Sequence, residues 1–383
     1  MSWTSRIAAA TPAHRDRTID ALRAVAIVGV ILGHWLVSAV VSDPDRPAAW
    51  EGASPLSGSP ALVPATWVLQ TLGLFFFAGG YSSARSLGGK PYRPWLTARL
   101  TRLARPVAVL AAVWVPTMLL LRLTGVPEST RHVVQSLITH PMWFLLVYVL
   151  LTALTPLLRK VGLWSVVPLV ALVALSDVSR WNGLVAPVGW AVPYLLGIAL
   201  AEGRLHRRAG AILAPAGVVA GAVLVLGLGY PASAVGVPGD GWSNLNPPTL
   251  FALALAAAQI GVFLLLRPRL AGWLQRPAVW APVVMLNLGA MTLFCWHQSA
   301  LLLVTAGGLA AGPLPGLLDA PDGAWPLYRL VWLPVFAVVL AGLWSVFRRW
   351  ETGDRRASAR VRAVEDMHTG GEALKVGVGD GQR

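Results

Sequence analysis

The chain has 383 residues, of which 56% are hydrophobic and only 13% are charged. Soluble domains carry about 25% charged residues, so this composition excludes an ordinary soluble protein and indicates a membrane protein. The net charge of +14 does not indicate nucleic-acid binding, because the basic residues form short clusters between apolar runs rather than one stripe. The single cysteine, Cys295, lies in an apolar run and excludes a disulfide framework.

Apolar stretches recur along the chain. A helix crosses a hydrocarbon layer about 30 Å thick with roughly 20 mostly apolar residues. Ten stretches approach this length, and the fifth and sixth are short. They are Ile19–Val41, Ala61–Ser83, Pro106–Leu123, Met142–Leu158, Leu163–Ser176, Pro187–Ala201, Gly210–Tyr230, Thr249–Leu266, Val283–Gly307 and Leu330–Phe347. We therefore expect an all-α polytopic membrane protein with about ten transmembrane helices.

The basic residues predict the orientation of these spans. Of the 31 lysines and arginines, 25 fall in alternate connecting segments or in the two terminal segments. Only five fall in the other segments, and Arg23 lies within the first span. Because Lys and Arg are retained on the cytoplasmic side, both termini are predicted to be cytoplasmic. We expect a multi-pass integral membrane protein.

The domain organisation is simple. Residues 1–18 are predicted to form a cytoplasmic segment, 19–350 one membrane domain, and 351–383 a disordered cytoplasmic tail that is polar and poor in aromatic residues. The loops between spans are too short for a separate catalytic module. Residues 6–39 also resemble a cleavable signal peptide, but the charged segment is long and the apolar run continues to Val41.

The first span carries three polar residues, Asp20, Arg23 and His34, and ionisable residues in a span are functional hypotheses by default. Asp20 and Arg23 are three residues apart and can pair on one helix face. Arg23 and His34 are eleven residues apart, almost three turns, so they share a face and lie roughly 16 Å apart along the axis. Alternatively, Arg23 reaches to the cytoplasmic headgroups and His34 only packs between helices. A histidine can act as a general base near neutral pH.

Five sequence motifs together resemble the membrane acyltransferase-3 family, in a divergent bacterial subgroup. The first helix of that family carries an Arg and a His separated by ten residues. The matching runs are Arg17 to His34, Phe75-Phe76-Phe77-Ala78-Gly79-Gly80-Tyr81, Arg99-Leu-Thr-Arg102 ahead of Pro106, Trp143-Phe144-Leu145 and Trp296-His297-Gln298. Two departures stand out: the second run lacks the serine common in the family, and Arg105 intervenes before Pro106.

The resemblance implies an O-acyltransferase of the cell envelope, located in a bacterial cytoplasmic membrane. An acyl group would leave a cytoplasmic acyl-CoA, such as acetyl-CoA, and reach a hydroxyl of a carbohydrate, lipid or other acceptor at the outer side. Arg23 and His34 would be catalytic. The expected partners are membrane lipids, acyl-CoA and the acceptor, with no permanently bound cofactor and no nucleic acid. The scattered histidines predict no metal site. Acceptor identity, acyl length, oligomeric state and the choice between direct transfer and an acyl-enzyme stay open.

The donor is expected to bind at the inner side. Arg99, Arg102 and Arg105 recur at three-residue intervals ahead of the third span, and their guanidinium groups could bind phosphates; Arg85 is a further candidate. Retention of positive charge inside predicts arginines there equally well. Gly79 and Gly80 would let a pantetheine chain approach the backbone, or would permit close helix packing.

The depth of a second histidine suggests a shared site. His34 lies fourteen residues beyond Asp20, and His297 lies fourteen beyond Val283 in a span of the same direction, so each is about 21 Å from its inner end. We expect the two histidines to line one cavity, with His297 catalytic as a positioning or relay group, or else a packing residue.

Tryptophans are expected on the acceptor side of this cavity. Trp35 follows His34 directly, and Trp143 begins the fourth span at the outer mouth, near His140. Trp143 could stack on a sugar or anchor the helix at the membrane interface.

A transporter or flippase for a lipid-linked or small-molecule substrate is the main alternative. Proton-coupled transporters place Asp or Glu within the membrane, whereas the acidic residues here fall near the ends of the expected spans. A non-catalytic scaffold would not explain an Arg and a His on one helix face.

Overall fold

A computed structural model describes residues 2–12, 15–43, 45–180, 185–239, 241–309 and 314–352. Within these residues, eight helices are long and apolar enough to cross a membrane, and nine if one pair of helices bent by 90° is counted as a span. The all-α polytopic class is confirmed, with fewer spans than the expected ten. Of the predicted tail, residues 353–383 lie outside the described residues.

The helices fall into full spans, shorter apolar helices and one bent pair. The helices within the eight spans are α2 (Arg17–Val37), α3 (Val63–Leu69) with α4 (Leu72–Leu87), α5 (Tyr92–Leu123), α6 (Glu128–Thr139) with α7 (Trp143–Ala153), α11 (Arg207–Ala222), α12 (Leu250–Trp273), α14 (Ala290–Leu309) and α15 (Trp325–Thr352). The bent pair is α8 (Thr155–Val161) with α9 (Val166–Ser179), and the shorter helices are α1 (Trp3–Ala9), α10 (Val185–Ala201) and α13 (Pro277–Leu288).

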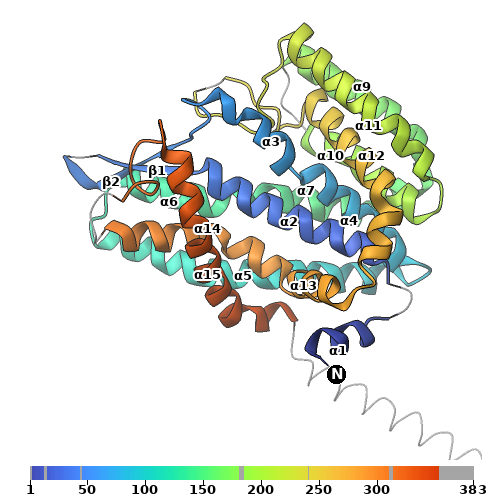
Figure 1. Ribbon diagram of the computed structural model, residues 1–383, viewed down its shortest axis with the longest axis horizontal. Coiled ribbons are helices and arrows are strands. Elements are labelled where there is room, and N and C mark those ends of the chain that lie inside the picture. The colour runs from blue at the N-terminus through green and yellow to red at the C-terminus, as the bar shows by residue number, and fades with distance from the viewer. Residues whose placement is uncertain are drawn as a thin grey trace, which may run out of the picture.

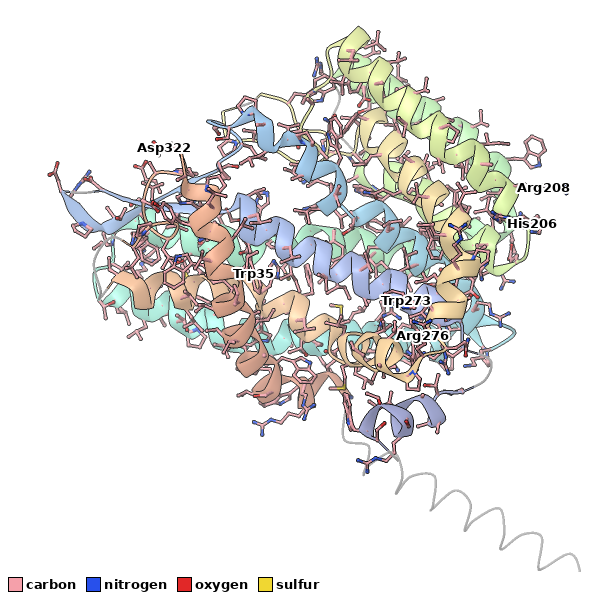
Figure 2. The ribbon with its side chains drawn as sticks, in the orientation of Figure 1. Trp35, His206, Arg208, Trp273, Arg276 and Asp322 are labelled. Atoms are coloured by element: carbon pink, nitrogen blue, oxygen red, sulfur yellow. The ribbon has the colours of Figure 1, made fainter. Side chains whose placement is uncertain are left out.

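The two ends of the bundle differ in composition. Figure 1 shows α2 running through the centre, with α1 near its start and the strands β1 (Ala39–Asp43) and β2 (Arg46–Ala53) beyond its end. In Figure 2, His206, Arg208 and Arg276 lie at the end where α2 begins, and Asp322 lies at the opposite end. The positive-inside rule therefore predicts that α2 begins at the cytoplasmic end.

The first span is shorter than expected. The helix α2 ends at Val37, and the apolar residues after it form β1, which pairs antiparallel with β2. This ribbon is fixed to the outer end of the bundle, because the Trp50 amide donates to the Thr130 hydroxyl at 2.8 Å. Val40 and Val41 are thus β-branched residues of a strand rather than the end of a helix.

Other spans also differ from the prediction: the fourth begins at Glu128, the fifth is part of the bent pair, and the sixth is one of the shorter helices. The third span begins at Tyr92, and Pro106 lies inside α5 rather than at its start. The second is broken at Gln70 and Thr71, where the Gln259 amide donates to the carbonyls of Trp67 and Gln70. Such breaks are tolerated in a membrane where the freed backbone groups find partners.

The expected ninth span is two helices. The helix α13 ends at Leu288 and α14 begins at Ala290. A Cβ at the intervening Gly289 would lie 1.7 Å from the Trp344 indole nitrogen, so a larger residue at the break would force this side chain of α15 to move.

Candidate functional site

Two histidines from distant parts of the chain lie side by side. The ring centroids of His34 on α2 and His297 on α14 are 5.1 Å apart, with an angle of 46° between the ring planes. The predicted proximity is confirmed, although the break at Gly289 means that His297 follows the start of its helix by seven residues, not fourteen. At the start of α14, the carboxylate of Glu351 from the end of α15 accepts hydrogen bonds from the Met291 and Thr292 amides.

The polar atoms of the pair are held in distinct ways. His297 is fully buried, and its Nδ1–H donates to the Phe294 carbonyl, which leaves Nε2 as an acceptor. Among the described residues, this Nε2 is one of the buried polar atoms without a hydrogen-bond partner. The Gln298 side-chain amide lies 3.4 Å from His34 Nδ1. Buried polar groups are rarely left unpaired, so an unpartnered Nε2 beside a second imidazole is typical of a functional site.

Trp35 and Arg329 fix the outer ends of these helices. The Trp35 indole donates to the His297 carbonyl at 2.9 Å and is almost fully buried. The fully buried Arg329 guanidinium donates to the carbonyls of Trp35, Ser38 and Gly316 at 2.6–2.8 Å. Trp35, expected at the acceptor side, instead ties α2 to α14 (Figure 2).

A cavity of about 640 Å³ lies beside His34. His34 is partly exposed and lies on its wall, as do the predicted Trp143 and the neighbouring His140. The other lining residues are Val30, Gly33, Leu36, Val37, Pro55, Leu56, Leu62, Ala65, Thr66, Leu69, Gln70, Leu72, Pro141, Phe144, Val235, Gly236, Ser243, Leu245, Asn246, Phe294, Pro326 and Leu330. Because several of these belong to the outer loops, the cavity occupies the outer half of the bundle. His297 does not line this cavity. The expectation that both histidines line one cavity therefore holds for His34 only, and His297 lies behind it.

The expected pair at the inner end of α2 is present. Arg23 Nη1 lies 4.0 Å from Asp20 Oδ1, and Arg15 also pairs with Asp20. Next to them, Asp16 caps α2 and lies 2.7 Å from Arg267. Burial raises the pKa of Asp16, but the Thr18 hydrogen bond and the Arg267 charge outweigh it, so the pKa is lower than usual. Arg23 is therefore part of a cytoplasmic charge cluster, at the opposite end of α2 from the cavity.

The four candidate donor arginines have different surroundings. Arg99 donates to the Ser82 carbonyl and to the hydroxyls of Ser83 and Ser86, and thereby ties α5 to α4. Arg85, Arg102 and Arg105 are exposed. The structure thus gives Arg99 a helix-linking contact and leaves the other three at the surface.

Both candidate glycines face other helices. A Cβ at Gly79 would lie 2.5 Å from the Tyr148 ring, and one at Gly80 would lie 2.0 Å from the Tyr194 carbonyl oxygen. Gly197 on α10 has the same relation to α4, with the Phe77 carbonyl oxygen at 1.9 Å from such a Cβ. This arrangement is the close helix packing that was the alternative to pantetheine contact.

Two acidic residues near the ends of the expected spans bind residues of other segments. Asp177 accepts hydrogen bonds from the Tyr230 hydroxyl and the Leu250 amide, and Glu202 pairs with Arg159 and Arg204. In the described part of the chain, no three His, Cys, Asp or Glu residues gather as a metal site would require.

Sequence reasoning missed three residues of the site. Gln298 follows His297 in the last motif, and only its 3.4 Å approach to His34 gives it a role. His140 was placed near the outer mouth without a function. Arg329 is one of the five basic residues that the sequence places in the outer segments, and its burial could not be read from the sequence.

Comparison with known proteins gives one match. Residues 16–348 match a family model described as an acyltransferase domain, named Acyl_transf_3. This range includes both histidines and the cavity. No curated protein and no solved structure matches the chain.

Proposed function

Because the chain belongs to the acyltransferase-3 family of membrane acyltransferases, we propose that it moves an acyl group, such as acetyl, from a cytoplasmic acyl-CoA to a hydroxyl of an acceptor reached from the outer side. The protein is then an O-acyltransferase. The acceptor is a carbohydrate, a lipid or another hydroxylated compound of the cell envelope.

The observation that carries this proposal is the position of His34. Its imidazole lies on the wall of an outer cavity and is backed by a buried imidazole with an unpartnered nitrogen. A hydroxyl in the cavity can reach His34, while His297 behind it is fully buried. These are the conditions under which a histidine activates a hydroxyl nucleophile.

The reaction moves one proton from the acceptor to the leaving group by way of His34. The acceptor oxygen attacks the thioester carbonyl carbon, a C–O bond forms, and the C–S bond breaks. His34 takes the hydroxyl proton as the attack occurs and then gives it to the departing CoA thiolate, which leaves as the thiol. His297, with its Nδ1–H held by the Phe294 carbonyl, keeps Nε2 as a proton acceptor beside His34.

Gln298 can set the tautomer of His34. The oxygen and nitrogen of a side-chain amide are assigned from their surroundings. With the Gln298 amide turned over, Oε1 accepts a hydrogen bond from His34 Nδ1–H, and His34 Nε2 is left with the lone pair that a general base needs. The same rotation supplies a partner for Gln298 Oε1, which is otherwise buried without one among the described residues.

The donor is proposed to bind at the cytoplasmic end. The exposed side chains of Arg85, Arg102 and Arg105 are available for phosphate groups, and Arg99 holds α5 against α4 beside them. The inner position of these arginines supports a cytoplasmic donor, and the outer position of the cavity supports an acceptor from the other side.

Membrane vesicles with radiolabelled acetyl-CoA test the proposal. We expect an ester product, identified by release of the label in mild alkali, and a loss of about 10²–10⁴-fold in rate for His34→Ala. His206→Ala is the matched control, because His206 is exposed at the opposite, cytoplasmic end (Figure 2). Unchanged transfer by folded His34→Ala protein, or label in an alkali-stable amide, would contradict the proposal.

The transporter alternative has no specific support here. Transport coupled to protons uses acidic groups inside the membrane, whereas Asp177 and Glu202 hold helix ends and loops together. We therefore retain the acyltransferase as the proposed function.

A further inference from the structure

The outer cavity indicates the chemical class of the acceptor. Its volume of about 640 Å³ is in the range of pockets that enclose a drug-sized molecule. An acetyl group and one hydroxyl need only a small part of this space. The rest of the cavity volume is then available to the remaining part of the acceptor molecule.

The lining of the cavity is mostly apolar and carries no formal charge. None of the lining residues is Asp, Glu, Lys or Arg. Its inner part is formed by aliphatic and aromatic side chains such as Val30, Leu72, Phe144 and Phe294. An apolar ligand part gains about 25 cal/mol for each Å² that it buries against such a wall.

Several polar groups of the wall already have partners in the protein. The Thr66 hydroxyl donates to the Val63 carbonyl and accepts from the Ala234 amide. Gln70 Oε1 accepts from the Leu72 amide, and the Ser243 hydroxyl accepts from the Leu245 amide. The other polar side chains of the wall are His34, His140, Trp143 and Asn246, and aliphatic and aromatic residues outnumber them. A sugar ring that entered this space would therefore lose more water from its hydroxyls than the wall replaces, which is costly for each unpaired group.

The wall is continuous with surface that faces lipid. Ala65 on α3 and Leu330 on α15 line the cavity and are also exposed, Leu330 to 49%. Their neighbours Val68 and Val331 are 73% and 72% exposed, and both helices belong to spans. Large exposed apolar residues on a membrane helix face the hydrocarbon, so the cavity borders the lipid phase.

The depth of His34 fits a molecule held in the outer leaflet. His34 lies three residues before the end of α2, roughly 5 Å along the axis, whereas Val30 lies about 6 Å deeper. A hydroxyl at the base of a headgroup reaches His34 while an attached chain extends along Val30 and Leu72. Building on the proposed function, we propose that the acceptor is a hydroxyl-bearing amphiphile of the outer leaflet whose apolar chain occupies this cavity.

Photolabelling of the full chain in phosphatidylcholine nanodiscs tests the proposal. The probe is a long-chain primary alcohol with a diazirine in mid-chain, and labelled peptides are mapped by mass spectrometry. We expect label on the segments that contain Leu69, Phe144 and Phe294. Ala65→Trp should reduce that labelling about tenfold, the effect of excluding roughly two methylenes. Val68→Trp, on the same helix but outside the cavity, should not reduce it.

Three results would overturn the proposal. One is labelling of lipid-facing positions alone, equal in all variants. Another is equal or stronger cavity labelling by a diazirine derivative of methyl glucoside, which would indicate a water-soluble acceptor. The third is preferential labelling by a long-chain diazirine acyl-CoA, which would assign the cavity to the donor chain. Since none of these readouts requires acyl transfer, failure here is distinguishable from failure of the His34 assay.

Discussion

Replacing Gly80 by alanine tests whether this glycine serves helix packing or ligand contact. A Cβ at this position on α4 would lie 2.0 Å from the carbonyl oxygen and 2.9 Å from the carbonyl carbon of Tyr194 on α10. Ordinary van der Waals contacts begin near 3.4 Å. Both atoms belong to the backbone of a buried helix, so no side chain can turn away. The two helices must separate, and the contacts around Gly197 must loosen with them.

The magnitude follows from a comparison of two glycines. Overpacking of a tight interface costs about 1–3 kcal/mol. Any Gly→Ala change in a helix also brings up to about 1 kcal/mol of intrinsic stabilisation. Gly342→Ala on α15 is the matched control, because a Cβ there meets nothing within 4 Å. The intrinsic gain cancels in this comparison, and Gly80→Ala should be about 1–3 kcal/mol less stable than Gly342→Ala.

The single cysteine supplies the assay. Cys295 is 3% exposed, so a thiol-reactive fluorescent dye reports unfolding of the purified protein as the temperature rises. We expect a lower midpoint for Gly80→Ala than for wild type, and an equal or higher one for Gly342→Ala. Equal midpoints for the two variants would refute the packing argument. An unchanged midpoint together with weaker dependence on acyl-CoA would assign Gly80 to the donor site.

Three further predictions concern the ends of the helices. Arg329→Ala removes three charge-assisted hydrogen bonds to the carbonyls of Trp35, Ser38 and Gly316. At about 1.5–3 kcal/mol each, their loss should lower the thermal midpoint sharply. The control is Arg131→Ala, because Arg131 is half-buried and its Nε donates to the Val126 carbonyl at 3.1 Å; an equal midpoint for the two variants would contradict the prediction. Glu351→Ala leaves the Met291 and Thr292 amides uncapped and should lower the free energy of unfolding by about 1–2 kcal/mol. Truncation after Trp350 should lower the thermal midpoint as Glu351→Ala does, whereas truncation after Thr352 should not. The carboxyl of Asp16 has a pKa below its usual 3.8, because the Thr18 hydrogen bond and the Arg267 charge outweigh burial. Its stabilising contribution is therefore complete above the unfolded-state pKa of 3.8 and is lost as the pH falls from there through the lower folded-state pKa. The midpoint difference between wild type and Asp16→Asn should shrink over that acid range, and a difference independent of pH would contradict the assignment.

Properties that depend on local composition and helix geometry could be predicted from the amino-acid sequence. Apolar runs of spanning length and the distribution of Lys and Arg predict a polytopic protein and its orientation. The spacing of Asp20, Arg23 and His34 predicts their shared helix and the Asp20–Arg23 pair, because helical periodicity is a property of one segment.

Contacts between helices that are distant in the sequence could be seen only in the tertiary structure. The break at Gly289 is set by contact with Trp344, and the packing of Gly79 and Gly80 is set by tyrosines of other helices. Trp35 was expected at the acceptor side, yet its indole bonds to the carbonyl of His297, 262 residues away. No local pattern encodes such a partner. The sequence predicts that His34 and His297 lie at similar depth. Only the packing of α2 on α14 shows that the His34 imidazole lies on the cavity wall and the His297 imidazole behind it.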